Sequence, residues 1–142
     1  METTEKKYVE ALRDEHAELF EHIEKLEEVL DTVQTPMELS RQLHTVRTEI
    51  TEHFYFEEDG GYMTPLLKEE PRFGGLVKHL LAEHRAMSET LDAIIKEVHG
   101  AISVGDGTRD RARAWVKQLR HHESKENRLV QEAYYSTGAT GD

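Results

Sequence analysis

The sequence contains no cysteine and only three prolines, and each shortage narrows what the chain can do. Without cysteine there is no disulfide, no thiolate zinc site and no cysteine nucleophile. With so few prolines, long helices can run without interruption. No stretch is apolar for long enough to span a bilayer, and no apolar signal region precedes the first amphipathic pattern. We therefore expect a cytoplasmic protein with no membrane segment.

Positive charge is also scarce, because 18 Lys and Arg residues stand against 29 Asp and Glu residues, for a formal net charge of -11. Phosphate backbones and anionic lipids repel such a surface, so we expect neither a nucleic-acid nor a membrane partner. The 142 residues suit a single domain, 1–142, that can bury a sizeable core. The nine histidines are the part of the composition that most needs an explanation.

Apolar residues recur at alternating steps of three and four along four segments, which is typical of amphipathic helices. Pro36, the Gly60-Gly61 pair and Gly105 separate these segments. Because short connections favour antiparallel neighbours, the sequence predicts an all-α, up-down-up-down antiparallel four-helix bundle. The expected helices cover about residues 5–33, 37–58, 74–102 and 108–135, and we also allow for a short extra helix within 62–72 and a frayed tail at 136–142.

In all four expected helices, histidines or glutamates occupy positions of the apolar series where leucine would be expected. Burying charged carboxylates without partners costs a great deal of free energy. Divalent metal ions would offset that cost, because anionic carboxylates and neutral imidazoles are both metal ligands. The residues concerned are His16, His53, Glu57, His84, His122 and Glu126.

The two halves of the chain repeat this pattern. His53 and His122 each follow an earlier histidine at nearly the same separation, and each has a glutamate four residues further on. That spacing puts each His-Glu pair on one face of its helix. In an alternating bundle the six residues fall at about the same depth, so they can meet in one layer. A core histidine that is held only by hydrogen bonds would explain one histidine on a core-facing side. It does not explain four histidines that face the core at the same depth.

The order H…HxxxE…H…HxxxE is carried by Asp14-Glu15-His16-Ala17-Glu18-Leu19, His53-Phe54-Tyr55-Phe56-Glu57-Glu58, Glu83-His84 and His122-Glu123-Ser124-Lys125-Glu126. Over nearly the whole chain this order resembles the hemerythrin family, the HHE cation-binding domains. The resemblance implies a non-haem centre of two iron ions (Fe2+/Fe3+) held by the six residues named above. It further implies that Glu57 and Glu126 bridge the ions together with an oxo or hydroxo group, in a pocket open to O2 or related small molecules.

Two positions depart from the pattern of the oxygen-carrying members of that family. Those proteins have a second histidine on the third helix, where this chain has Leu80, and an aspartate near the end of the fourth helix, where this chain has Glu126. One imidazole is therefore missing, which leaves more coordination positions open to solvent or ligand. The chain is more similar to bacterial hemerythrin-like proteins with two HxxxE pairs, for which redox sensing, iron binding, and peroxide or nitric-oxide chemistry are implied.

These observations favour a di-iron protein that binds or reacts with O2, peroxide or NO. The alternative is a non-enzymatic module that binds or stores iron, or senses oxygen or redox state, without turnover. Imidazole and carboxylate donors also suit zinc and manganese. A ferritin-like carboxylate oxidase is excluded, because such bundles need Glu-x-x-His pairs and the residues three before the four histidines are Arg13, Ile50, Leu81 and Leu119.

Other polar residues near the pattern have weaker claims to ligation. Glu58 points about 100° away from Glu57, so we expect it to lie on the surface or to support a ligand, for example by accepting an imidazole N–H, rather than to bind metal. Tyr62 is a candidate lid or hydrogen-bond donor, and His79 is expected to flank the core. The remaining histidines are interpreted as solvated or structural, and they are His22, His44, His99 and His121.

Replacing His53 or His122 by alanine is expected to lose metal, because each substitution removes an imidazole ligand. His44→Ala is the matched control, since His44 lies with Arg41 and Arg47 on a polar face. Elemental analysis of the three purified variants checks this prediction. Equal metal content in all three would contradict the ligand assignment.

Overall fold

The computed structural model describes residues 4–32, 35–59 and 63–133, and within these ranges it contains helices and no strand. Four long helices are α1 (Thr4–Asp31), α2 (Pro36–Glu58), α4 (Gly74–Val98) and α5 (Asp106–Gln131). Between α2 and α4 lie the short helix α3 (Met63–Glu69) and a 3-10 turn, η1 (Pro71–Phe73).

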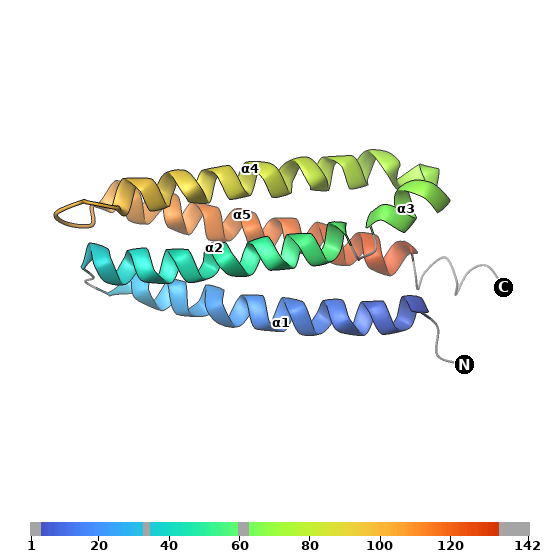
Figure 1. The fold of residues 1–142 in the computed structure, drawn as a ribbon, viewed down its shortest axis with the longest axis horizontal. Coiled ribbons are helices and arrows are strands. Elements are labelled where there is room, and N and C mark those ends of the chain that lie inside the picture. The colour runs from blue at the N-terminus through green and yellow to red at the C-terminus, as the bar shows by residue number, and fades with distance from the viewer. Residues whose placement is uncertain (1–3, 33–34, 60–62, 134–142) are drawn as a thin grey trace.

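The long helices form an antiparallel bundle in which each one runs opposite to the next along the chain (Figure 1). α1 packs on α2, α2 on α4, α4 on α5, and α5 returns to contact α1, so the four surround one core. The predicted all-α, up-down-up-down four-helix bundle is therefore confirmed. No helix in the described ranges has a segment both long and apolar enough to cross a membrane.

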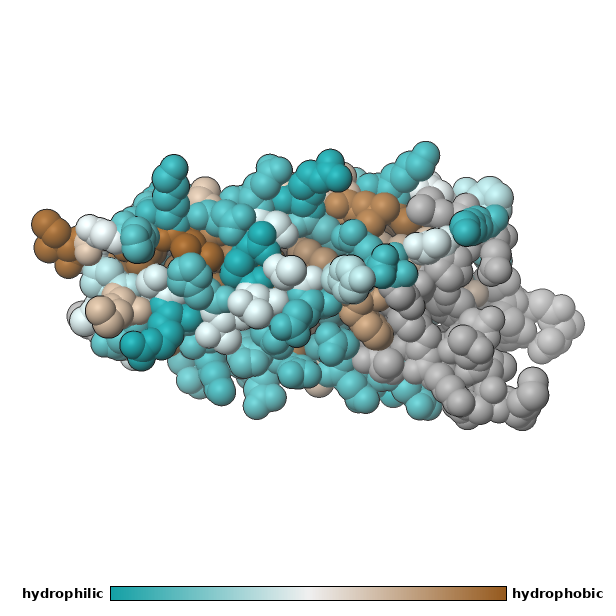
Figure 2. Space-filling model, viewed as in Figure 1, coloured by the Kyte–Doolittle hydropathy of each residue, from teal (hydrophilic) through white to brown (hydrophobic). Residues whose placement is uncertain are grey.

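The apolar core is divided into two clusters by a polar layer. Along α4, Val77 and Leu80 belong to a small cluster beside α3, whereas Met87 and Leu91 belong to a large cluster that fills the rest of the bundle. His84 lies between the two groups on the same buried face. On α5, His122 is placed in the same way between the two clusters. The outer face seen in Figure 2 is mainly hydrophilic, as expected for helices with one apolar face each.

The helix ends follow local chemistry. Thr35 caps α2, because its hydroxyl oxygen accepts a hydrogen bond from the backbone N–H of Glu38 at 3.2 Å, and Pro36 occupies the first turn. The helix expected at 74–102 ends earlier, at Val98, because Gly100 adopts a φ of 81° in the left-handed region that favours glycine. Ile102, the last residue of the expected helix, is consequently 99% exposed in the loop.

Two contacts fix the position of α5 along its neighbours. The indole Nε1 of Trp115 donates to the backbone oxygen of Met87 on α4 at 2.9 Å. Arg109 donates to the backbone oxygens of Leu30 and Thr32, which satisfies carbonyls left open at the end of α1. Both contacts hold α5 in register with α1 and α4. The expected frayed tail at 136–142 and the expected lid residue Tyr62 lie outside the described residues.

Leu43→Ala is expected to lower the free energy of unfolding by about 2–5 kcal/mol, because Leu43 is fully buried in the large apolar cluster. Met37→Ala on the same helix is the control, since Met37 is 72% exposed and its loss should change stability by less than about 0.5 kcal/mol. Denaturant unfolding of both variants gives the comparison. Equal stabilities would contradict the assigned packing of α2.

Candidate metal centre

The six residues predicted from the sequence meet in one buried layer near the α3 end of the bundle. α1 contributes His16, and α2 contributes His53 and Glu57. α4 contributes His84, and α5 contributes His122 and Glu126. Their exposed fractions lie between 0% and 9%, so the layer is closed off from bulk water. The complete predicted set is His16, His53, Glu57, His84, His122 and Glu126.

The donor atoms of this layer form two groups, and within each group they lie within 4.8 Å of one another. Glu57 and Glu126 belong to both groups. Each group could hold a metal ion, and the two groups are joined by the shared carboxylates. The first group is His16, His53, Glu57, Glu123 and Glu126, and the second is Glu57, His84, His122 and Glu126.

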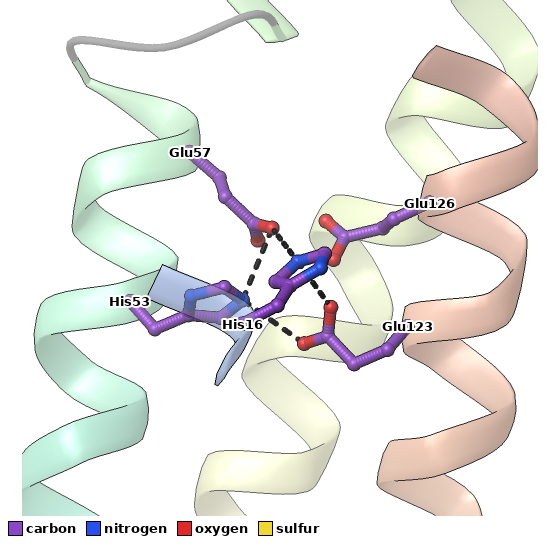
Figure 3. Close-up of side chains that lie close together, drawn as sticks. All are labelled: His16, His53, Glu57, Glu123 and Glu126. Atoms are coloured by element: carbon purple, nitrogen blue, oxygen red, sulfur yellow. Dashed lines mark hydrogen bonds and ion pairs between the residues drawn. The ribbon is translucent and has the colours of Figure 1, made fainter. Parts of the chain in front are cut away.

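The first group is shown in Figure 3, where side chains from α1, α2 and α5 point toward one another. The Nε2 atom of His16 lies 2.8 Å from Oε2 of Glu123 and 3.6 Å from Oε2 of Glu57. The Nε2 atom of His53 lies 3.0 Å from Oε1 of Glu123 and 3.1 Å from Oε2 of Glu57. Two imidazoles therefore face two carboxylates across the interior.

The second group has the same form around α4 and α5. Nε2 of His84 lies 3.2 Å from Oε1 of Glu57 and 3.4 Å from Oε2 of Glu126. Nε2 of His122 lies 3.5 Å from Oε1 of Glu126. The two oxygens of Glu57 thus face different groups, with Oε2 toward the histidines of α1 and α2 and Oε1 toward His84.

Glu123 is a member of the first group that the sequence reasoning missed. Its neighbour His122 already occupied the expected core position, and adjacent helical residues point about 100° apart. However, α5 buries a second row of residues, Val116, Glu123 and Val130, which recur every seven positions. That row was the signal available in the sequence, since a carboxylate inside it also needs compensation for burial.

The sequence profile of the hemerythrin HHE cation-binding domain matches residues 7–134. The chain belongs to this family. Searches of curated proteins and of solved structures found no match. The family match covers α2, α4 and α5 completely and α1 from residue 7 onward, and it includes every member of both donor groups.

In this hemerythrin-like bundle, carboxylates outside the layer orient the imidazoles. Nδ1–H of His84 donates to Oε2 of Glu58 at 2.5 Å, which is the contact expected for Glu58 from the sequence. Nδ1–H of His122 donates in the same way to Oε1 of Glu83 at 2.7 Å. A proton held on Nδ1 leaves the Nε2 lone pair directed into the layer, as a metal ligand requires.

Glu83 is itself held in place by a cation, because Nζ of Lys125 lies 2.5 Å from its Oε2. Its counterpart in the first half of the chain is Glu15, whose Oε1 lies 4.0 Å from Nδ1 of His53. In each half, the glutamate that precedes the first histidine therefore faces the outer nitrogen of the second histidine.

The other histidines stay outside the layer. His79 is exposed, and its Nε2 atom lies 3.2 Å from Oε2 of Glu83. It therefore flanks the core as expected and does not replace the imidazole that is missing at Leu80. Nε2 of His22 lies 3.7 Å from Oε1 of Glu49, a half-buried contact away from both donor groups. Three more are exposed, and they are His44, His99 and His121.

The residues of the layer fit a bound metal ion. Both carboxylate oxygens of Glu57 and the Nε2 atoms of His84 and His122 are buried close to other polar groups of the layer, but none of them makes a hydrogen bond among the described residues. Buried polar atoms without partners are rare in folded proteins because their desolvation is uncompensated. Oxygen and imidazole nitrogen are ligands suited to iron, manganese and zinc, so a metal would satisfy these atoms.

When no metal is bound, protons on the histidines help to balance the negative charge of the buried carboxylates. Burial lowers the pKa of His16, but the nearby carboxylates of Glu123 and Glu57 outweigh it and raise the pKa to about 9. His84 behaves in the same way, since burial is outweighed by Glu126 and Glu57, and its pKa also rises to about 9. A metal must therefore displace protons from these imidazoles at neutral pH.

The two shared carboxylates differ in the same metal-free state. Burial and the negative charges of Glu126 and Glu123 raise the pKa of Glu57 well above its usual value. Burial also opposes ionisation of Glu126, but the contacts with His122 and His84 lower its pKa well below the usual value. Glu126 is thus the carboxylate that the imidazoles hold in the anionic form.

The metal-free protein is expected to lose stability as the pH rises from 6.5 to above 9. A histidine with a raised pKa stabilises the fold fully below its unfolded pKa of 6.5, and this contribution disappears as the pH passes the folded pKa of about 9. Thermal unfolding in the presence of a chelator should show a Tm lower by about 4 °C or more at the higher pH. Metal-loaded protein is the control, because metal has replaced the protons. A Tm that is flat or rises with pH would contradict the prediction.

Proposed function

We propose that this hemerythrin-like domain binds two iron ions and uses them to bind or react with O2, peroxide or NO. The observation that carries the proposal is the pair of donor groups that share Glu57 and Glu126. His16, His53 and Glu123 would complete the first position, and His84 with His122 would complete the second. Iron is the metal implied by the resemblance to hemerythrins.

The charges of the layer support two cations better than one. Three buried carboxylates, Glu57, Glu123 and Glu126, need more positive charge than a single divalent ion supplies. Two ions that change between Fe2+ and Fe3+ would supply electrons to a bound diatomic molecule or peroxide. The protein's own part is to hold the donors, orient the imidazoles through Glu58 and Glu83, and keep bulk water out.

A second candidate is a module that binds or stores iron, or senses oxygen or redox state, without turnover. The division of the core into two clusters favours it, because the metal layer contacts all four long helices. Occupancy of the layer would then change the stability of the whole bundle. A metal-dependent Tm without peroxide consumption supports this candidate, whereas rapid consumption of peroxide excludes it as the full account.

Protein loaded with iron is expected to hold about two ions per chain, one for each donor group, and to show a near-ultraviolet charge-transfer band. Glu123→Gln should weaken iron binding at the first position by at least about tenfold, since even groups outside the ligand set cost that much when removed. Iron titration followed by elemental analysis measures both results.

The matched control for Glu123→Gln is Glu52→Gln, because Glu52 is an exposed neighbour of His53 on α2. This control should keep wild-type stoichiometry and affinity. A wild-type protein that takes up no iron would refute the proposed function. Wild-type affinity in Glu123→Gln would remove Glu123 from the ligand set while leaving the other ligands in place.

A further inference from the structure

The two halves of the bundle are related by a repeat, but one pair of equivalent residues differs in chemistry. In each half, one residue directly follows the second histidine: Phe54 follows His53, and Glu123 follows His122. Both side chains are buried, with exposed fractions of 5% and 1%. The repeat therefore places a carboxylate at one donor group and an aromatic ring at the other.

Glu123 and Phe54 each turn toward the histidines of the other half of the chain. Glu123 contacts His16 and His53, as described above. Phe54 stacks on His84, with ring centroids 3.8 Å apart and ring planes at 7° to each other. The Phe54 and His122 rings meet edge to face, with centroids 5.9 Å apart. An apolar ring thus stands beside the second group at the place where the first group has its fifth protein donor.

The two metal positions are consequently unequal. Two imidazoles and three carboxylates surround the first position, whereas two imidazoles and two carboxylates surround the second. A ring carries no lone pair that a metal ion of this class would bind. The position between His84 and His122 therefore keeps more room in its coordination sphere for a molecule that the protein does not supply.

A groove on the surface leads to the same side of the layer. It lies between α2 and α4, has a volume of about 550 Å³, and is lined among others by Phe54, Glu58, His84 and Ser88. Because Phe54 and His84 are almost completely buried, their stacked rings form its inner wall. A second groove at Ser40 and His99 lies near the opposite end of the bundle, where α2 begins and α4 ends.

We propose that small ligands enter through the α2–α4 groove and bind at the metal position of His84 and His122, and that Phe54 controls this step. The ring keeps protein donors away from the second position and separates it from the groove. A change in the side-chain rotamer of Phe54 opens the path between the groove and this position. The proposal rests on the proposed di-iron function and adds the position and the route of the ligand.

The route is tested with azide, a small anion that binds ferric iron and gives a visible charge-transfer band. Ser88→Trp places a large ring in the groove, and Ser40→Trp places the same ring in the distant groove as the matched control. Stopped-flow mixing of azide with iron-loaded, oxidised protein should show association slowed by about tenfold or more in Ser88→Trp alone. The Kd of azide should stay the same in both, because only access has changed.

The role of Phe54 is tested separately by Phe54→Glu, which copies the chemistry of Glu123 at the second position. Iron content should remain at the wild-type value, and azide affinity should fall by about tenfold or more, since azide must then displace a carboxylate. Phe54→Leu keeps an apolar side chain and should keep wild-type affinity with faster association, because a smaller group covers the entrance. If Phe54→Glu does not fold, the association rates of azide in Phe54→Leu and Ser88→Trp show whether Phe54 and the groove control ligand entry.

The outcomes separate this proposal from the proposed function. A wild-type protein that binds no iron overturns both, and a wild-type protein that binds iron but not azide overturns this proposal alone. A wild-type protein that binds iron and azide, with equal association rates in Ser88→Trp and Ser40→Trp, overturns the route alone. Wild-type azide affinity in an iron-loaded Phe54→Glu protein overturns the assignment of the ligand to the second position.

Discussion

The burial of negative charge in the middle of an apolar bundle is the constraint on which the rest of the structure depends. Glu57, Glu123 and Glu126 are at most 1% exposed, and four imidazoles are the polar groups that face them. Such a layer folds only if positive charge balances it. Without metal, protons on the histidines serve this purpose, which is why His16 and His84 have pKa values of about 9.

The surroundings of the layer hold its donors at fixed positions. Apolar clusters lie on both sides of it along α4 and α5, so the polar residues there cannot relax toward solvent by a small shift. On the outside, Glu58 and Glu83 accept the Nδ1 protons of His84 and His122 and direct the Nε2 atoms inward. Packing therefore sets the depth of the ligands, and hydrogen bonds set the direction of their lone pairs.

The repeat explains why two similar donor groups exist, and its departures explain why they differ. Equivalent histidines and glutamates from the two halves build both groups, and Glu57 and Glu126 join them. Phe54 and Glu123 occupy equivalent places with opposite chemistry, which leaves one group with an additional carboxylate and the other with an aromatic wall beside a groove. If both groups bind metal as proposed, the first would hold its ion with more protein donors and the second would admit a ligand.

The sequence by itself determined the helices, their antiparallel order and the six histidines and glutamates of the layer, because helical periodicity and i,i+4 spacing are local properties. Only the tertiary structure decided the rest. Glu123 joins the layer because α5 buries a second row of residues, which brings Glu123 to His16 on α1 and His53 on α2. The contacts of Glu83 and Phe54 likewise cross between helices. Such contacts depend on how helices are rotated and aligned against one another, which no single helix encodes.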